Sequence, residues 1–273
     1  MSVVVGLLVA AVLVAWLAPR FLTAGRWQPR RPRLALALWH LTLLLVLLLL
    51  LGATAVAVGL AAFDATPGEG GSEPVAIIGW VLLLGLGGAI VSLSVGSEGA
   101  FDDASAVLDE LHAVSHEESW SSDGTRILTF DVSMPFACAV PGRTPTLIVT
   151  AGLRALLSDE RFEAVLEHER AHLTYRHHLA MGIARLYAGC LPRTRTARSL
   201  LRTTRLLIEL MADDASARRV GAVHLANALA QVGEVTGDAS MIARAERLTL
   251  RRWAPARHLG ERDAAPAHGR LAP

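Results

Sequence analysis

The sequence predicts an α-helical membrane protein, in which three amino-terminal spans precede an α-rich (α+β) domain with a small β-hairpin or sheet. Two observations support this prediction. Of the 273 residues, 52% are hydrophobic and the mean hydropathy is +0.41, which is too apolar for an ordinary soluble domain. The apolar residues are also concentrated in three long runs before residue 98, and after that point the composition becomes that of a soluble domain, with apolar residues at helical spacing in 162–173.

The three apolar runs predict membrane spans at about 3–22, 34–62 and 75–95, within an anchor formed by residues 1–97. A helix of about 20 apolar residues is long enough to cross the hydrocarbon layer of a bilayer. A cleaved signal peptide is the alternative for the first run. No positive charge precedes that run and arginines follow it, so we expect a retained anchor.

The loops between these spans differ in charge, and this difference predicts an orientation. The first loop carries arginines without an acid, and the second carries acids without a lysine or arginine: Arg20, Arg26, Arg30, Arg31 and Arg33 against Asp64, Glu69 and Glu73. Basic residues in short loops favour the cytoplasmic side. We therefore expect a multi-pass protein of the cell membrane, with its amino terminus outside and the domain after the third span in the cytoplasm.

Residues 98–235 are expected to form the second domain, and residues 236–273 a carboxy-terminal extension that is disordered towards its end. Apolar and polar residues alternate along 127–134, as they do in a β-strand. Two further short runs, 136–140 and 146–150, flank a turn that contains proline and glycine and so predict a hairpin.

A shorter apolar segment, residues 179–191, is interrupted by Arg185. It is too short to be assigned as a span and is predicted to be a core helix or a membrane-facing amphipathic helix. A run of arginines follows it: Arg193, Arg195, Arg198, Arg202 and Arg205. Such a run is more typical of a solvated or lipid-headgroup face than of a nucleic-acid site.

The stretch from Leu166 to Leu173 contains the pattern H-E-x-x-H, formed by His168, Glu169 and His172. On a helix, two histidines four residues apart lie one turn above the other and can bind one zinc ion. The glutamate between them is placed to take a proton from the attacking water. An unpaired imidazole or carboxylate on this partly apolar face would be costly, and a metal ion removes that cost.

A catalytic zinc site needs a third protein ligand, and the sequence offers two candidates. His178 has the spacing of a third histidine, but the pattern that uses this spacing needs a glycine where this chain has Tyr175. Glu209 lies in a second helical segment together with Asp213, four residues later. We favour Glu209 as the ligand, with Asp213 orienting a ligand histidine.

H-E-R-A-H followed by the helical sequence E-x-x-A-D, behind several apolar spans, resembles the integral-membrane gluzincin peptidases. The BlaR/MecR-type family is the most similar, and the related HtpX and CAAX-prenyl-protease family shares the same core. The segment 135–142 is similar to the strand and turn upstream of the zinc helix in these peptidases. The resemblance covers roughly residues 1–230. It implies that His168, His172 and Glu209 are zinc ligands, Glu169 the general base and Asp213 a supporting residue.

We therefore expect a membrane-bound zinc metalloendopeptidase with one catalytic Zn²⁺ ion. Resemblance to the BlaR/MecR-type family implies a regulatory, antirepressor-type protease that cleaves a transcriptional repressor. The strand near residues 147–150 is expected to align an extended peptide substrate by backbone pairing. Two alternatives stay open: an HtpX-like quality-control protease, and a catalytically silent scaffold that keeps the peptidase fold.

The expected partners are a protein or peptide substrate and the lipid bilayer. The formal net charge is only +1, so the chain carries no strong basic field of the kind that binds nucleic acid, and we expect no direct nucleic-acid binding.

Overall fold

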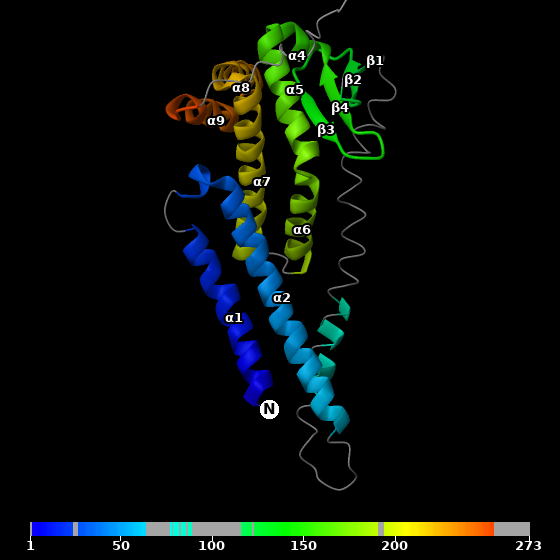
Figure 1. The fold of residues 1–273 in the computed structure, drawn as a ribbon, viewed down its shortest axis with the longest axis vertical. Helices are drawn as coiled ribbons and strands as arrows, with labels where there is room; N and C mark the ends of the chain where they lie inside the picture. Colours follow the sequence, from blue (N-terminus) through cyan, green and yellow to red (C-terminus); the bar gives the residue numbers. More distant parts are fainter. Residues whose placement is uncertain are drawn as a thin grey trace, which may run out of the picture. The chain divides into compact units, whose positions relative to one another are not determined.

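The computed structural model describes residues 2–23, 27–63, 77, 79–81, 83–85, 87, 88, 116–121, 123–190 and 194–253 (Figure 1). The chain forms two compact units. The apolar unit comprises Met1–Ser105 and Leu179–Ile208, and the sheet unit comprises Ala106–His178 and Glu209–Pro273. The described helices α6 and α7 each begin in one unit and end in the other.

Two long helices dominate the apolar unit: α1, Ser2–Thr23, and α2, Pro32–Phe63, with the short helix η1, Gln28–Arg30, between them. Both are long and apolar enough to cross a bilayer. Only 11% of the most apolar 18-residue stretch of α1, and 17% of that of α2, is buried. A core helix of a soluble protein would bury most of that surface. The two helices match the first two predicted spans and weakly suggest a membrane protein.

Small side chains let α1 and α2 pack closely, since Ala53 and Ala57 of α2 are fully buried in a cluster with Val4 of α1. The third predicted span, 75–95, lies largely outside the described residues. Of its positions, those described from 77 to 88 are helical. A third membrane span therefore stays a prediction.

The apolar unit also contains most of α6, His177–Cys190, and the first half of α7, Arg195–Ser216. Their apolar faces join the end of α1 and the start of α2 in one cluster. Its buried members are Leu22, Ala35, Trp39, Ala184, Leu200 and Leu207. The described part of the predicted segment, 179–190, is thus helical, as its composition predicts, and this helix packs beside the apolar hairpin of α1 and α2.

The sheet unit holds a four-stranded sheet of order β1-β2-β4-β3. Its strands are β1, His116–Trp120; β2, Arg126–Phe130; β3, Ala137–Val140; and β4, Thr146–Thr150. The β3–β4 pair is antiparallel, which confirms the predicted hairpin, whereas β2 and β4 are parallel. Because β4 pairs on both sides, it has no free edge for a substrate, and the expected pairing of a substrate with residues 147–150 is wrong. In the described part of the chain, β3 is an edge strand of this sheet.

Strand β2 ends at Phe130, four residues before its predicted end, because the chain turns there to pack on the next helix. That helix is α4, Ala151–Leu156, and the amide of its Gly152 donates to the carbonyl of Val132 at 2.9 Å. A Cβ atom at Gly152 would lie 1.9 Å from the carbonyl oxygen of Ser133. Glycine is therefore required where this loop crosses α4.

Helix α5, Asp159–Thr174, begins after Ser158, whose hydroxyl bonds to Glu160 rather than to a backbone amide. Beyond α7 follow the π-helical turn η2, Ala217–Gly221, then α8, Ala222–Thr236, and α9, Ala239–Leu250. The core joins one face of the sheet to α5 and α8 through Leu147, Val149, Leu166, Ala228 and Val232. Helix α9 lies where the sequence predicted an extension, and it packs on α8 (Figure 1).

Candidate metal centre

Helix α5 brings His168 and His172 together at the carboxyl-terminal end of its buried face. The Nε2 atoms of the two rings lie 3.2 Å apart, and the ring centroids 5.0 Å. This arrangement follows from the spacing of four residues, which stacks the two side chains one turn apart. His168 is buried and His172 is partly buried.

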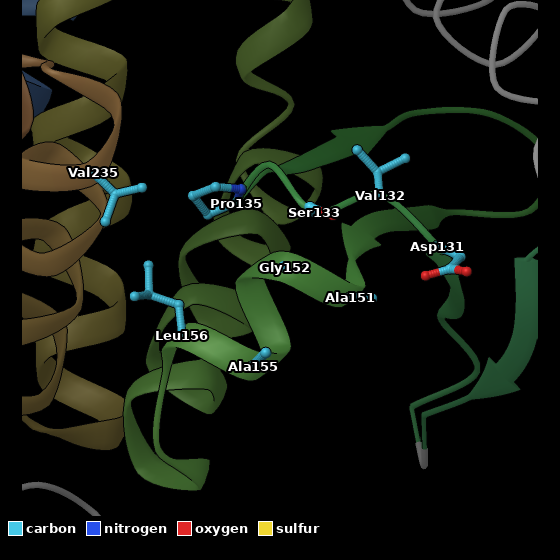
Figure 2. Close-up of a pocket in the computed structure, with 9 residues that line it drawn as sticks. All are labelled: Asp131, Val132, Ser133, Pro135, Ala151, Gly152, Ala155, Leu156 and Val235. Atoms are coloured by element: carbon cyan, nitrogen blue, oxygen red, sulfur yellow. The ribbon is translucent and has the colours of Figure 1, made fainter.

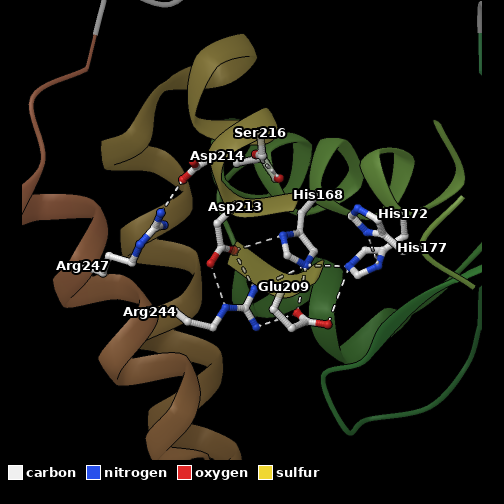
Figure 3. A network of polar contacts seen from close by, with 10 residues as sticks. His168, His172, His177, Glu209, Asp213, Asp214, Ser216, Arg244 and Arg247 are labelled. Atoms are coloured by element: carbon white, nitrogen blue, oxygen red, sulfur yellow. Dashed lines mark hydrogen bonds and ion pairs between the residues drawn. The ribbon is translucent and has the colours of Figure 1, made fainter. Parts of the chain in front are cut away.

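The carboxylate of Glu209, on α7, faces both imidazoles (Figure 3). Its Oε2 lies 3.4 Å from Nε2 of His168, and its Oε1 lies 3.8 Å from Nε2 of His172. Potential ligand atoms of the three residues all lie within 4.8 Å of one another. Ligands about 2.0–2.1 Å from one tetrahedral zinc ion would be separated by about 3.3 Å, so these side chains fit zinc without rearrangement of the backbone.

Asp213, one turn after Glu209 on α7, lies behind His168. Its Oδ1 is 3.1 Å from Nδ1 of His168, on the side of the ring away from Glu209. A carboxylate in this position fixes the tautomer and orientation of an imidazole whose other nitrogen binds a metal. Asp213 is fully buried, and the guanidinium of Arg244 lowers its pKa despite the opposing effect of burial.

Arg244, on α9, connects the two carboxylates of α7 (Figure 3). Its Nε and Nη2 donate to the two oxygens of Asp213 at 2.8 and 2.6 Å, and its Nη1 lies 2.8 Å from Oε2 of Glu209. This planar fork fixes the spacing between the carboxylates. Arg244 was not among the site residues predicted from the sequence. The signal was present in the sequence, because Asp238 is a good helix start and Met241, Ala245 and Leu248 repeat at helical spacing.

The turn between α5 and α6 decides which later histidine reaches the site. Arg176 takes a left-handed conformation, with φ of 50°, and this brings His177 back onto His172. The two Nδ1 atoms lie 3.1 Å apart, and His177 is buried. His178, the rival third ligand, does not belong to the cluster of potential ligands. The chain thus turns one residue after Tyr175 and places His177, which the sequence did not predict as a site residue, beside His172.

Glu169 lies between the metal cluster and the edge of the sheet. The backbone amide of Ala139, on β3, donates to its carboxylate. Burial raises the pKa of Glu169 to about 7, although the neighbouring His168 acts in the opposite direction. A carboxylate with a pKa near neutrality is suited to accept and return protons at physiological pH.

The two imidazoles differ in their affinity for protons. Burial disfavours a charge on both, but the carboxylates of Asp213 and Glu209 outweigh it and raise the pKa of His168 to about 10. Burial and the neighbouring charge of His168 lower the pKa of His172 to about 3. Because a metal ion binds the neutral imidazole, metal binding here would displace a proton from His168.

Cys138, on β3, is a free thiol near Glu169. Burial and the charge of Glu169 raise its pKa to about 12. A thiol is a nucleophile only as the thiolate, so Cys138 is unsuited to nucleophilic catalysis at neutral pH.

The face of α5 away from the metal cluster is fixed by a network of ion pairs. Buried Glu167 accepts from Arg170 at 2.6 Å and from Arg219, in η2, at 2.7 Å. Arg170 also donates to Ser121, in the turn between β1 and β2. Ser216, at the end of α7, donates to the carbonyl of Ala164 at 2.7 Å. These contacts connect the sheet, α5 and α7 around the two histidines.

A pocket of about 480 Å³ occupies a different part of the sheet unit (Figure 2). It lies between the β2–β3 loop, α4 and the end of α8, and its lining is mostly apolar or small. The lining residues are Asp131, Val132, Ser133, Pro135, Ala151, Gly152, Ala155, Leu156 and Val235. Asp131 is the single titratable side chain in this lining, so the pocket lacks the donor set of a metal or acid–base centre.

Residues 130–231 match the model of peptidase family M48. This segment runs from the end of β2 into α8 and includes both histidines, Glu169, Glu209 and Asp213. The match supports the M48 metallopeptidase family, whose members are zinc-dependent, for this part of the chain. No curated protein and no solved structure gives a significant match to the chain.

Proposed function

We propose that this chain is a membrane-bound zinc metalloendopeptidase. The observation that carries the proposal is the convergence of His168, His172 and Glu209, whose potential ligand atoms lie within 4.8 Å of one another beside Glu169. Two imidazoles and one carboxylate are the donor set of several zinc peptidases and leave a coordination position open. Zinc bound there supplies Lewis acidity towards the scissile carbonyl and the attacking water.

The protein side chains have separate roles in this proposal. Glu169 accepts the proton of the attacking water and passes it to the leaving amine, which its pKa of about 7 suits. Asp213 holds His168, and His177 holds His172, each through the ring nitrogen Nδ1. Arg244 keeps Glu209 and Asp213 at a fixed separation.

Strand β3 is the proposed platform for an extended substrate. In its antiparallel pairing with β4, the carbonyl of Phe136 accepts from the amide of Thr150, so by alternation the backbone groups of Ala137 and Ala139 point away from β4. The amide of Ala139 reaches Glu169. A peptide paired with this edge would therefore run beside the proposed base, and backbone pairing tolerates varied substrate sequences.

The proposed location is the cell membrane, with α1 and α2 as spans and the metal centre on the cytoplasmic side. The arginines between α1 and α2 support this orientation through the positive-inside rule, provided that a third span follows. The proposed substrate class is a cytosolic or membrane-proximal protein. A regulatory protease that cleaves a repressor is the version that the resemblance to the BlaR/MecR-type family favours, and an HtpX-like quality-control protease is the alternative.

Cleavage of a peptide library by the purified full chain tests the proposed function. We expect cleavage that a zinc chelator abolishes and added zinc restores. Zinc at full occupancy without cleavage of any peptide would instead support the silent scaffold.

A further inference from the structure

Four arginines form one stripe on the first half of α7. They are Arg195, Arg198, Arg202 and Arg205, and all four are exposed. Their spacings of three, four and three residues place them on one side of a helix with 3.6 residues per turn. We call this set the arginine stripe.

The opposite side of the same helix is apolar and covered. Leu200 and Leu207 are buried in the cluster that also contains Leu22 of α1 and Trp39 of α2. All of these residues belong to the apolar unit. The arginine stripe therefore faces outward from a helix whose inner side rests on the ends of the two candidate spans.

Among the described residues, no acid forms an ion pair with the stripe, and the first acid after it on α7, Glu209, pairs with Arg244 instead. No aspartate or glutamate occurs between residues 179 and 208. None of the four arginines forms an ion pair with another described residue, whereas exposed arginines of the sheet unit do, such as Arg154 with Asp159 and Arg219 with Glu167. Four guanidinium groups without an acidic partner among the described residues favour binding of an anion from outside the chain.

The neighbourhood of the stripe indicates which anion. The cluster under α7 includes Ala35 and Trp39 of α2. Immediately before them the chain carries the exposed Arg30, Arg31 and Arg33, and immediately after them α2 exposes leucines, among them Leu41, Leu44 and Leu48. This change from basic to apolar surface marks the level at which phospholipid head groups would lie. Arginine also binds phosphate through two parallel hydrogen bonds.

We propose that the arginine stripe binds the head groups of anionic phospholipids, in the leaflet on the side of the α1–α2 turn. This inference rests on the proposed membrane location, but not on peptidase activity. Each basic residue near a charged leaflet typically strengthens binding by on the order of fivefold. Loss of two arginines should therefore weaken the preference for anionic lipid by on the order of 25-fold.

Native mass spectrometry of the full chain in mild detergent tests this proposal. The protein is incubated with equal amounts of phosphatidylglycerol and phosphatidylcholine, and retained lipids are counted. We expect the wild type to retain mainly phosphatidylglycerol, and R198Q/R202Q to lose most of that preference. R198K/R202K should keep much of it, because the charge remains.

The matched control is R143Q/R252Q, which removes two exposed arginines of the sheet unit and should behave as the wild type. Equal retention of phosphatidylglycerol by R198Q/R202Q and by this control would overturn the proposal. The proposal would also be overturned if free inorganic phosphate, added as a competitor, reduced phosphatidylglycerol retention equally in the wild type and in R198Q/R202Q. Zinc content is measured on the same samples. A chain without zinc or peptidase activity that still selects phosphatidylglycerol through the stripe would reject the proposed function and leave this inference standing.

Discussion

Each histidine of the H-E-x-x-H stretch has one particular neighbour at its Nδ1 atom. For His168 the neighbour is Asp213, at 3.1 Å, and for His172 it is His177, also at 3.1 Å. Both neighbours are buried, so neither contact competes with bulk water. Such partners direct the opposite ring nitrogen, Nε2, towards the metal position.

The adjacent pair His177 and His178 separates this orienting role from a general effect of removing a histidine. We expect H177A to lower zinc affinity by about 10–100-fold, since the ring of His172 loses its partner. H178A should bind zinc as the wild type does. The measurement is competition for zinc against a chromophoric chelator, with the visible spectrum of the cobalt-substituted protein reporting the geometry of the ligands. Equal affinities for the two variants would contradict the orienting role of His177.

At the scale of elements, the site depends on close approaches between segments that are distant in the sequence. Helix α9 reaches across α7 with Arg244, and the loop after β2 rests on Gly152 of α4. The second contact leaves no space for a side chain, because a Cβ atom would meet the backbone of Ser133. The loop leads directly into β3, the proposed substrate strand.

G152A should therefore destabilise the sheet unit by at least the ~1–3 kcal/mol typical of overpacked sites. A glycine in α6 offers the control, since a Cβ atom at Gly182 would have no neighbour within 4 Å. G182A should be neutral or slightly stabilising, as alanine favours a helix by ~1 kcal/mol over glycine. Thermal unfolding followed by a thiol-reactive dye measures both. An unfolding temperature for G152A that equals the wild type would show that this loop does not pack on α4 as described.

Periodicity in the sequence was sufficient to predict α1, α2, the β3–β4 hairpin and α5, because each has a strong local pattern. The predicted candidates His168, Glu169, His172, Glu209 and Asp213 also lie together in the structure. The contributions of Arg244 and His177 were not predictable in this way. Arg244 depends on how α9 packs across α7, and His177 depends on a left-handed residue, Arg176, that is neither glycine nor asparagine.

At the scale of the whole molecule, the proposed orientation decides which proteins are available as substrates. We expect a green fluorescent protein fused to the carboxyl end to fluoresce, and alkaline phosphatase at the same position to be inactive, since the metal centre is proposed to be cytoplasmic. Active phosphatase would place the domain outside. It would mean that the first apolar run is cleaved or that the number of spans is even.

In the proposed centre, His168, His172 and Glu209 hold one zinc ion while Glu169 acts as a base without binding it. The most direct test compares purified E169Q and E209Q with the wild type. Zinc content is measured by elemental analysis, and peptide cleavage is measured on the same samples. We predict about one zinc per chain in the wild type and in E169Q, a clear loss of zinc in E209Q, and cleavage by the wild type alone. Loss of zinc in E169Q, or full occupancy in E209Q, would contradict the account.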